Sequence, residues 1–131
     1  MKWFVPEEEA DSARKLKREY EQGKNDILSP QLILFEVANA LRYHPVVRMS
    51  EVDLATAIEA LRDMAITVEM YREVWVETFE LSRTEEISIY DAVYLGLAEL
   101  SQARFVTADH KLRDGLSDTL KQNVLLISDL E

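Results

Sequence analysis

The chain has 131 residues, no cysteine, and 15 basic residues against 25 acidic ones, for a net charge of −10. With 47% of its residues hydrophobic, a single domain over 1–131 can bury a substantial core, which excludes a disordered chain. The lack of cysteine excludes disulfides and thiolate metal sites, and the acidic balance argues against broad electrostatic binding of nucleic acid. No apolar run is long enough to span a membrane and no secretory signal is visible, so we expect a cytoplasmic protein with no membrane partner.

The N-terminal region predicts a helix over 7–22, in which glutamates come first and basic residues follow, the order that the helix dipole favours. Gly23 can end this helix in the left-handed conformation. Residues 27–28 are a short strand candidate. Ser29 and Pro30 then look like an N-cap followed by proline at the first helical position of the next helix.

The second predicted helix, 30–43, is nearly all apolar, so we expect it to be buried on most of its circumference. A third helix begins after Ser50, which reads as an N-cap, with Asp53 placed to complete a capping box. Residues 66–68 are β-branched and read as a strand.

The second half of the chain continues the alternation of helices and short strands. The expected elements are a helix over 72–82, a polar turn over 82–86, a helix from Ser88 to about Gln102, a strand over 104–107, a short helix from Asp109 to near Gly115, and a strand over 124–127. Such alternation predicts βαβ units and a mainly parallel sheet. Ligand sites in such sheets form at the carboxyl ends of the strands.

Three acids stand in apolar company, and Glu36 is the first of them. It lies inside the run LILFEVA, and Asn39 is the polar residue one turn later on the same face. An ionised carboxylate in such a setting needs a partner or a cation, because an unpaired buried charge is costly. Alternatively, Glu36 and Asn39 form the solvated edge of a helix, and the pattern alone slightly favours this second interpretation.

Asp91 and Asp109 stand at the starts of predicted helices. Asp91 opens the apolar stretch YDAVYLGLAEL. With Ser88 three residues earlier it can also be the acid of a capping box, and the pattern alone favours this interpretation. Asp109 follows the strand RFVT at its carboxyl end, where a site is expected, but aspartate is also an ordinary N-cap. Thr107 adds a hydroxyl at the same strand end.

If these three acids converge at one sheet edge, their charges need compensation. Two carboxylates about 4 Å apart repel by roughly 4 kcal/mol at an effective dielectric near 20. A cluster of three would therefore hold raised pKa values or a cation. Oxygen-only ligands favour Mg²⁺ or Mn²⁺ over Zn²⁺. Neither His44 nor His110 has the partner spacing of a zinc site, and each reads more simply as an exposed polar residue.

Four segments, KWFVPEEE, SPQLILFEVANAL, ISIYDAVYLGLAEL and FVTADHKL, together resemble the PIN domain, and within it the VapC-type toxins of prokaryotic toxin–antitoxin pairs. The resemblance implies a three-layer α/β/α sandwich with a short, mainly parallel sheet. It also implies an Mg²⁺- or Mn²⁺-dependent ribonuclease, a homodimer, and a small antitoxin that blocks the site. On the family's pattern Glu36, Asp91 and Asp109 match the catalytic, metal-binding acids, and Thr107 matches the usual nearby hydroxyl. Asn39 is a further supporting residue beside the first of these acids.

The sequence departs from the family pattern at its front. Family members carry an apolar first strand that ends in an aspartate, several residues before the segment that KWF matches. Nothing of this kind stands in the sequence, and Asp11 is no substitute because it falls inside the first predicted helix. Loss of that central strand would remove a metal ligand and leave the neighbouring strands without hydrogen-bond partners. We therefore expect either that Met1 is an internal start or that the chain is a member without its first strand.

The leading hypothesis is a metal-dependent endoribonuclease, the toxin of a type II toxin–antitoxin pair, whose three acids hold Mg²⁺ or Mn²⁺ that activates water. The cation would then receive the phosphate, which reconciles an acidic chain with an RNA substrate. Contacts to the RNA backbone would come from the densest group of cations, which also reads as a solvated helix face: Arg14, Lys15, Lys17 and Arg18. The alternative is a catalytically inactive PIN-like binding protein that acts through dimer or antitoxin pairing. A third hypothesis is a structural helix-rich domain whose acids are only caps.

Overall fold

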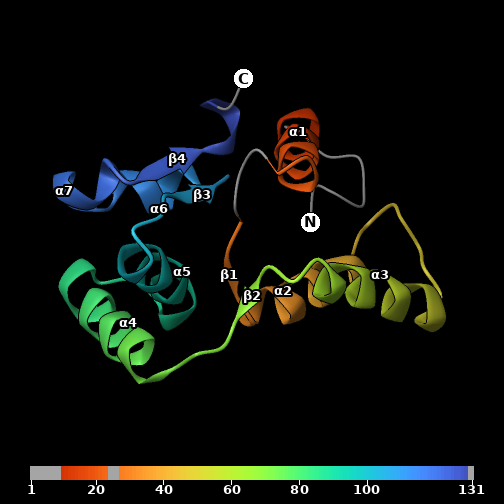
Figure 1. Cartoon of the computed structure of the whole chain (residues 1–131), viewed down its shortest axis with the longest axis horizontal. Helices are drawn as coiled ribbons and strands as arrows, with labels where there is room; N and C mark the ends of the chain where they lie inside the picture. Colours follow the sequence, from red (N-terminus) through yellow and green to blue (C-terminus); the bar gives the residue numbers. More distant parts are fainter. Residues whose placement is uncertain (1–9, 24–26, 130–131) are drawn as a thin grey trace. The chain divides into compact units, whose positions relative to one another are not determined.

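A computed structural model describes residues 10–23 and 27–129 of the chain (Figure 1). The chain divides into two compact units, the first within Met1–Glu69 and the second within Met70–Glu131. Helices and short strands alternate along both units. The segment KWFVPEEE, and with it the predicted helix start at residue 7, lies outside the described residues.

Over residues 10–23 and 27–69, the first unit has three helices and two short strands. In chain order these are α1 (Ala10–Glu21), β1 (Ser29–Pro30), α2 (Leu32–Arg42), α3 (Glu51–Asp63) and β2 (Thr67–Val68). Gly23 follows α1 with a φ of 74°, so it is the left-handed stop that the sequence predicts. The Tyr20 hydroxyl donates a 2.8 Å hydrogen bond to the Met64 carbonyl, which ties α1 to the end of α3.

Strand β1 corrects the expectation for its segment. The sequence predicts a strand at 27–28 and an N-cap at Ser29, but Ser29 and Pro30 are themselves the strand, paired in parallel with β2. The Ser29 N–H donates a 2.8 Å hydrogen bond to the Ile66 carbonyl, so pairing with a distant segment decides the conformation. Helix α2 consequently begins two residues later than predicted, with Gln31 at its N-cap and no side-chain hydrogen bond there.

Helix α2 is less buried than its apolar sequence predicts. Within α2, Val37 and Leu41 are the buried residues, and Phe35 is 73% exposed. The prediction of burial around most of the circumference is therefore wrong, because this helix packs one stripe against α3 and the loop before it. Val37 and Leu41 form the core of the first unit with Leu61 and Ile66.

In its described part, residues 70–129, the second unit has four helices, two strands and a last turn of 3₁₀ helix. In chain order these are α4 (Arg72–Glu85), α5 (Ile89–Leu100), β3 (Phe105–Thr107), α6 (His110–Asp114), α7 (Asp118–Lys121), β4 (Val124–Leu126) and η1 (Ile127–Asp129). Helix α4 runs through the polar segment predicted as a turn and ends at Glu86, which has a left-handed φ of 55°. The short helix α7 is not predicted from the sequence, because its four residues carry no periodic pattern.

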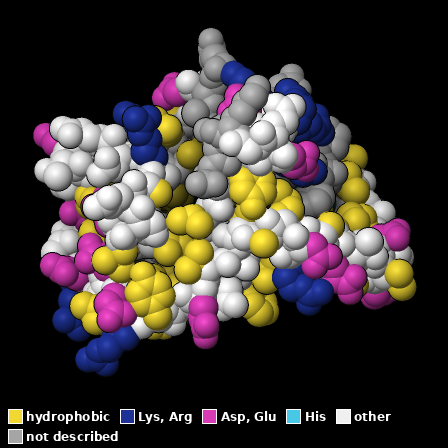
Figure 2. All heavy atoms as spheres, in the orientation of Figure 1, with side chains coloured by type: hydrophobic (Ala, Val, Ile, Leu, Met, Phe, Trp, Pro, Cys, Tyr) yellow, Lys and Arg dark blue, Asp and Glu magenta, His cyan; other side chains and the backbone are white. Residues whose placement is uncertain are grey.

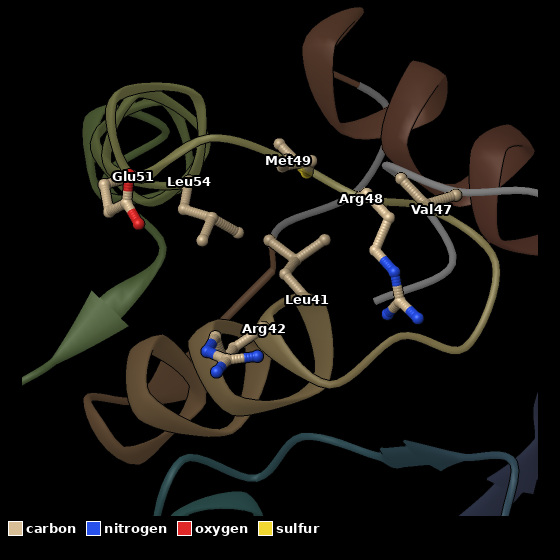
Figure 3. A pocket seen from close by; sticks show the side chains of 7 residues that line it. All are labelled: Leu41, Arg42, Val47, Arg48, Met49, Glu51 and Leu54. Carbon is tan, nitrogen blue, oxygen red and sulfur yellow. The ribbon is translucent and has the colours of Figure 1, made fainter.

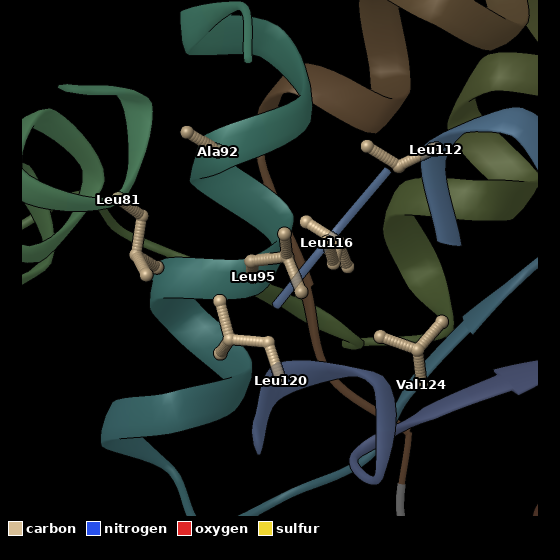
Figure 4. Packing of buried hydrophobic residues seen from close by; sticks show 7 residues of the cluster. All are labelled: Leu81, Ala92, Leu95, Leu112, Leu116, Leu120 and Val124. Atoms are coloured by element: carbon tan, nitrogen blue, oxygen red, sulfur yellow. The ribbon is translucent and has the colours of Figure 1, made fainter. Parts of the chain in front are cut away.

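A hydrophobic core joins every helix of the second unit to β4 (Figure 4). Its buried members come from α4, α5, α6, α7, the turn after α6 and the start of β4, and they are Leu81, Ala92, Leu95, Leu112, Leu116, Leu120 and Val124. Helices α4 and α5 lie side by side (Figure 1). Their contact is close, because a Cβ on Gly96 would stand 3.0 Å from the Thr78 hydroxyl oxygen.

The strands pair in parallel, which confirms the predicted α/β class with short parallel sheets. Within the described residues they form two pairs, β1 with β2 and β3 with β4. Among these same residues, no helix combines the length and the apolar character needed to cross a bilayer.

Candidate functional site

Asp91 lies in the first turn of α5, in the second unit, and is half-buried. Its backbone N–H donates a 3.1 Å hydrogen bond to the Ser88 hydroxyl, which confirms Ser88 as the N-cap of α5. The backbone of Asp91 is therefore fixed at the head of a buried helix, because the cap uses its N–H and not its carboxylate.

Asp109 is the N-cap of α6 and follows β3 at its carboxyl end. Its Oδ1 accepts a 3.0 Å hydrogen bond from the Leu112 N–H, so the predicted cap is confirmed. Its own N–H donates a 3.1 Å hydrogen bond to the Thr107 hydroxyl. Thr107 thus orients the turn that presents Asp109, and the second carboxylate oxygen of Asp109 remains available for a ligand.

One core positions both of these acids. Ala92, the neighbour of Asp91, and Leu112, which donates to Asp109, belong to the same buried cluster (Figure 4). The N-terminal turns of α5 and α6 are thereby fixed by a common set of apolar contacts. Rigid helical elements of this kind hold functional side chains more precisely than loops do.

Glu36 belongs to the first unit, where it is an exposed residue of α2. Asn39 is exposed one turn later, so the two polar side chains share one face as predicted. The exposed Phe35 stands beside them in the sequence. This face of α2 therefore combines an acid, an amide and an aromatic ring.

The described residues contain no group of three or more histidine, cysteine, aspartate or glutamate side chains gathered closely enough to hold a metal ion. The chemistry of the individual donors nevertheless suits a hard divalent cation, since they are carboxylate, amide and hydroxyl oxygens. Two of the three acids, Asp91 and Asp109, lie at helix N-termini.

The two histidines have no part in this set of donors. The Nδ1 atom of His44 accepts hydrogen bonds from the Val46 and Val47 N–H groups, at 3.2 and 2.9 Å, so this residue organises the turn after α2. His110 is exposed at the start of α6.

The four cations of α1 were the candidates for RNA contacts. Lys15 and Lys17 each lie near a glutamate one turn later, with Nζ to carboxylate distances of 3.9 Å to Glu19 and 3.6 Å to Glu21. Such exposed pairs within one helix stabilise it only slightly. Pairs of this kind are typical of a solvated helix face, which is the simpler of the two interpretations.

The structure adds a pocket of about 480 Å³ in the first unit that the sequence does not predict (Figure 3). Leu41 and Leu54 point into it from α2 and α3, and Arg42 and Arg48 stand at its rim. The loop between the two helices closes it, and a loop path of this kind leaves no periodic signal in a sequence.

Glu77 on α4 lies near two other glutamates. Burial raises the pKa of Glu77 above its ordinary value, and the negative charges of Glu80 and Glu99 raise it further. Figure 2 shows acidic, basic and hydrophobic side chains mixed at the surface in the region of α4.

Comparison with known proteins identifies the family. The family model of the PIN domain matches residues 1–115, a range that includes all three candidate acids. The chain is 31% identical over 114 residues to the protein named Ribonuclease VapC3 of Pyrobaculum aerophilum, and the alignment covers 85% of this chain and 84% of that relative. No solved structure matches the chain. The chain therefore belongs to the PIN domain family and is of the VapC type.

Proposed function

We propose that the chain is a metal-dependent endoribonuclease that serves as the toxin of a type II toxin–antitoxin pair. The observation that carries the proposal is the match to the PIN domain over residues 1–115. The similarity to a protein named as a ribonuclease supports the same conclusion. So does the placement of Asp91 and Asp109 at two helix N-termini fixed by one core.

Glu36, Asp91 and Asp109 are the residues that would hold Mg²⁺ or Mn²⁺. When bound, such a cation lowers the pKa of a water ligand and stabilises negative charge on a phosphate group. The chain itself supplies orientation: Ser88 and Thr107 accept hydrogen bonds from the backbones of Asp91 and Asp109. Asn39, on the same face as Glu36, is placed to support it with an amide.

The proposed substrate is RNA, and the proposed protein partners are a small antitoxin and a second copy of the chain. The cytoplasm is the proposed location, because these partners occur there. Contacts between RNA and Arg14, Lys15, Lys17 and Arg18 stay a weaker prediction, since Lys15 and Lys17 already pair with glutamates. With a net charge of −10, the chain would depend on the cation to receive the phosphate.

The test is RNA cleavage in the presence of Mn²⁺ by the purified chain and by its Asp91→Asn variant. We expect the variant to lose at least about 100-fold in rate, since even residues outside the ligand shell contribute roughly 10–100-fold at metal sites. The variant keeps the side-chain volume and the Ser88 cap, so its fold should be retained. Unchanged cleavage by Asp91→Asn would sink the proposed mechanism.

A matched control exists in α3. Asp53 lies three residues after the N-cap Ser50, and its N–H donates to the Ser50 hydroxyl at 3.1 Å, the same distance as in the pair of Asp91 and Ser88. Asp53→Asn therefore removes the same charge from the same position of a capped helix. It should leave cleavage unchanged, so a loss seen only in Asp91→Asn reports the site and not the cap.

The second candidate function is a catalytically inactive PIN-like protein that binds an antitoxin or a second copy. Cation-dependent cleavage by the wild-type chain, lost in Asp91→Asn, would rule it out. A wild-type chain that binds Mn²⁺ weakly and cleaves no RNA would favour it instead.

A further inference from the structure

Helix α4 exposes an unusual run of large apolar side chains. Tyr71, Trp75, Val76 and Phe79 are 47%, 42%, 56% and 50% exposed. The aromatic residues recur every four positions, so they form one ridge along the helix. The Trp75 and Phe79 rings lie 6.1 Å apart between centroids, which makes the ridge continuous.

A neighbouring face of α4 is already buried. Val74, Thr78 and Leu81 are buried, and the α4–α5 contact is close, since a Cβ on Gly96 would lie 3.0 Å from the Thr78 hydroxyl oxygen. The exposed ridge is therefore a second apolar face of the same helix. A helix that is apolar on two faces has a surface left to bury, and contiguous exposed apolar patches of this kind mark interaction sites.

The charges beside the aromatic ridge identify the partner. Arg72, Val76 and Glu80 form the adjacent ridge, at spacings of four residues, and all three are exposed. Arg72 and Glu80 each lie four residues, about 6 Å along the axis, from Val76. A two-fold axis through Val76 would bring Arg72 of each copy opposite Glu80 of the other. The surface is thus complementary to itself, as a two-fold interface requires.

We propose that two copies of this chain associate through an antiparallel contact of α4 with α4, centred on Val76. The aromatic ridges bury apolar area, and two symmetric Arg72–Glu80 pairs fix the register and orientation. The inference deepens the homodimer part of the proposed function by assigning its surface. It uses none of the three candidate metal ligands, so association and RNA cleavage can fail separately.

The size of the contact sets the expected affinity. Three aromatic side chains that bury a further half of about 150–250 Å² each supply roughly 300 Å² per copy. A standard interface buries about 800 Å² per partner, so a contact based on one helix belongs among the small and weak ones. Dimerisation should therefore be concentration-dependent and have a dissociation constant in the micromolar range.

The test is sedimentation velocity on the full chain and on two charge-reversed variants, Arg72→Glu and Glu80→Arg. Each variant places like charges opposite each other twice across the two-fold axis, so each should weaken self-association on the order of tenfold or more. An equimolar mixture of the two restores both opposite-charge pairs. The mixture should therefore form a heterodimer of about wild-type affinity.

The control variant reverses a charge at another exposed position of the same unit. Arg104→Glu reverses an exposed charge of the second unit outside α4, and it should leave self-association unchanged. The mixture also distinguishes charge repulsion from misfolding, because a misfolded variant would not regain association when the other variant is added. A wild-type chain that stays monomeric, whether or not another protein covers α4, overturns the proposal. So does a mixture that associates no better than either variant alone.

Discussion

Ser50 and Ser88 show how far a single residue can be interpreted from the sequence. Both are N-caps as predicted, and both accept a 3.1 Å hydrogen bond from the N–H of an aspartate three residues on. Capping is a local effect, decided within one turn, so the sequence predicts it well. Cap geometry alone cannot reveal function, because Asp53 and Asp91 have the same cap geometry. What separates them is the match of Asp91 to a family pattern.

Asp109 combines a cap and a proposed metal ligand, and two substitutions separate these roles. Asparagine caps helices about as well as aspartate, whereas alanine loses about 1 kcal/mol. Asp109→Asn should therefore unfold in urea within about 0.5 kcal/mol of the wild type while losing Mn²⁺-dependent cleavage. Asp109→Ala should lose both the activity and the cap.

The result that contradicts this assignment is a stable Asp109→Asn variant that still cleaves RNA at the wild-type rate. That outcome would leave Asp109 with one role, the helix cap formed by its hydrogen bond from the Leu112 N–H. Urea unfolding of both variants provides the control, since it measures the capping contribution independently of the cation.

At the scale of elements, the two wrong boundaries have different physical origins. Ser29 and Pro30 are a strand because Ser29 pairs with Thr67, which is far away in the sequence. Helix α4 extends to Glu85 and ends at a left-handed glutamate, a residue that gives no stop signal. Glycine at position 23 did give that signal, and there the predicted helix end is confirmed. The sequence therefore predicts a helix end where a residue such as Gly23 gives a stop signal, and it misses a boundary where the stop residue is unusual or the strand partner is distant.

Gly96 provides a test of the α4–α5 contact. Its Cβ would meet the Thr78 hydroxyl at 3.0 Å and the Thr78 backbone nitrogen at 3.3 Å. Neither atom can move freely, because the hydroxyl donates a 2.7 Å hydrogen bond to the Val74 carbonyl and the nitrogen belongs to α4. Gly96→Ala should therefore destabilise the chain by about 1–3 kcal/mol, the usual range for overpacking, as measured by urea unfolding.

Gly115 is the matched glycine for this experiment. Its φ is −82°, which any residue adopts, and a Cβ there would meet the Lys111 carbonyl oxygen at 3.4 Å. Gly115→Ala should be neutral or stabilise the chain by up to about 1 kcal/mol, through a less flexible unfolded state. Equal unfolding free energies for the two alanine variants would show that α4 and α5 do not pack as closely as described.

At the scale of the whole molecule, the sequence predicted the class but not the pairing. Alternation of helices and strands implies parallel strands, and both strand pairs are parallel. Nothing in the alternation says which strands are neighbours, because pairing depends on contacts between distant segments. The same limit applies to the site: each acid was predicted at the right element, whereas the assembly of Glu36, Asp91 and Asp109 depends on tertiary structure.

The net charge of −10 makes a prediction for the intact protein. A protein that binds a nucleic acid through 6–10 phosphate contacts loses roughly 10³–10⁵ in affinity between 50 and 200 mM salt. Here the proposed cation, and not a basic surface, receives the phosphate. The KM for a short RNA at fixed Mn²⁺ should therefore rise by less than about tenfold over the same salt range.

The double variant Lys15→Gln/Lys17→Gln decides how much of that salt dependence α1 supplies. Both lysines pair with glutamates on their own helix, so removing them should leave the salt dependence of KM unchanged. If they contact RNA, each lost phosphate contact would instead reduce the slope of log KM against log salt by about 0.7–0.9. A steep wild-type slope that this variant flattens would show that an acidic chain still binds RNA through a basic helix, and would shift the main source of RNA affinity from the carboxylate-bound cation to α1.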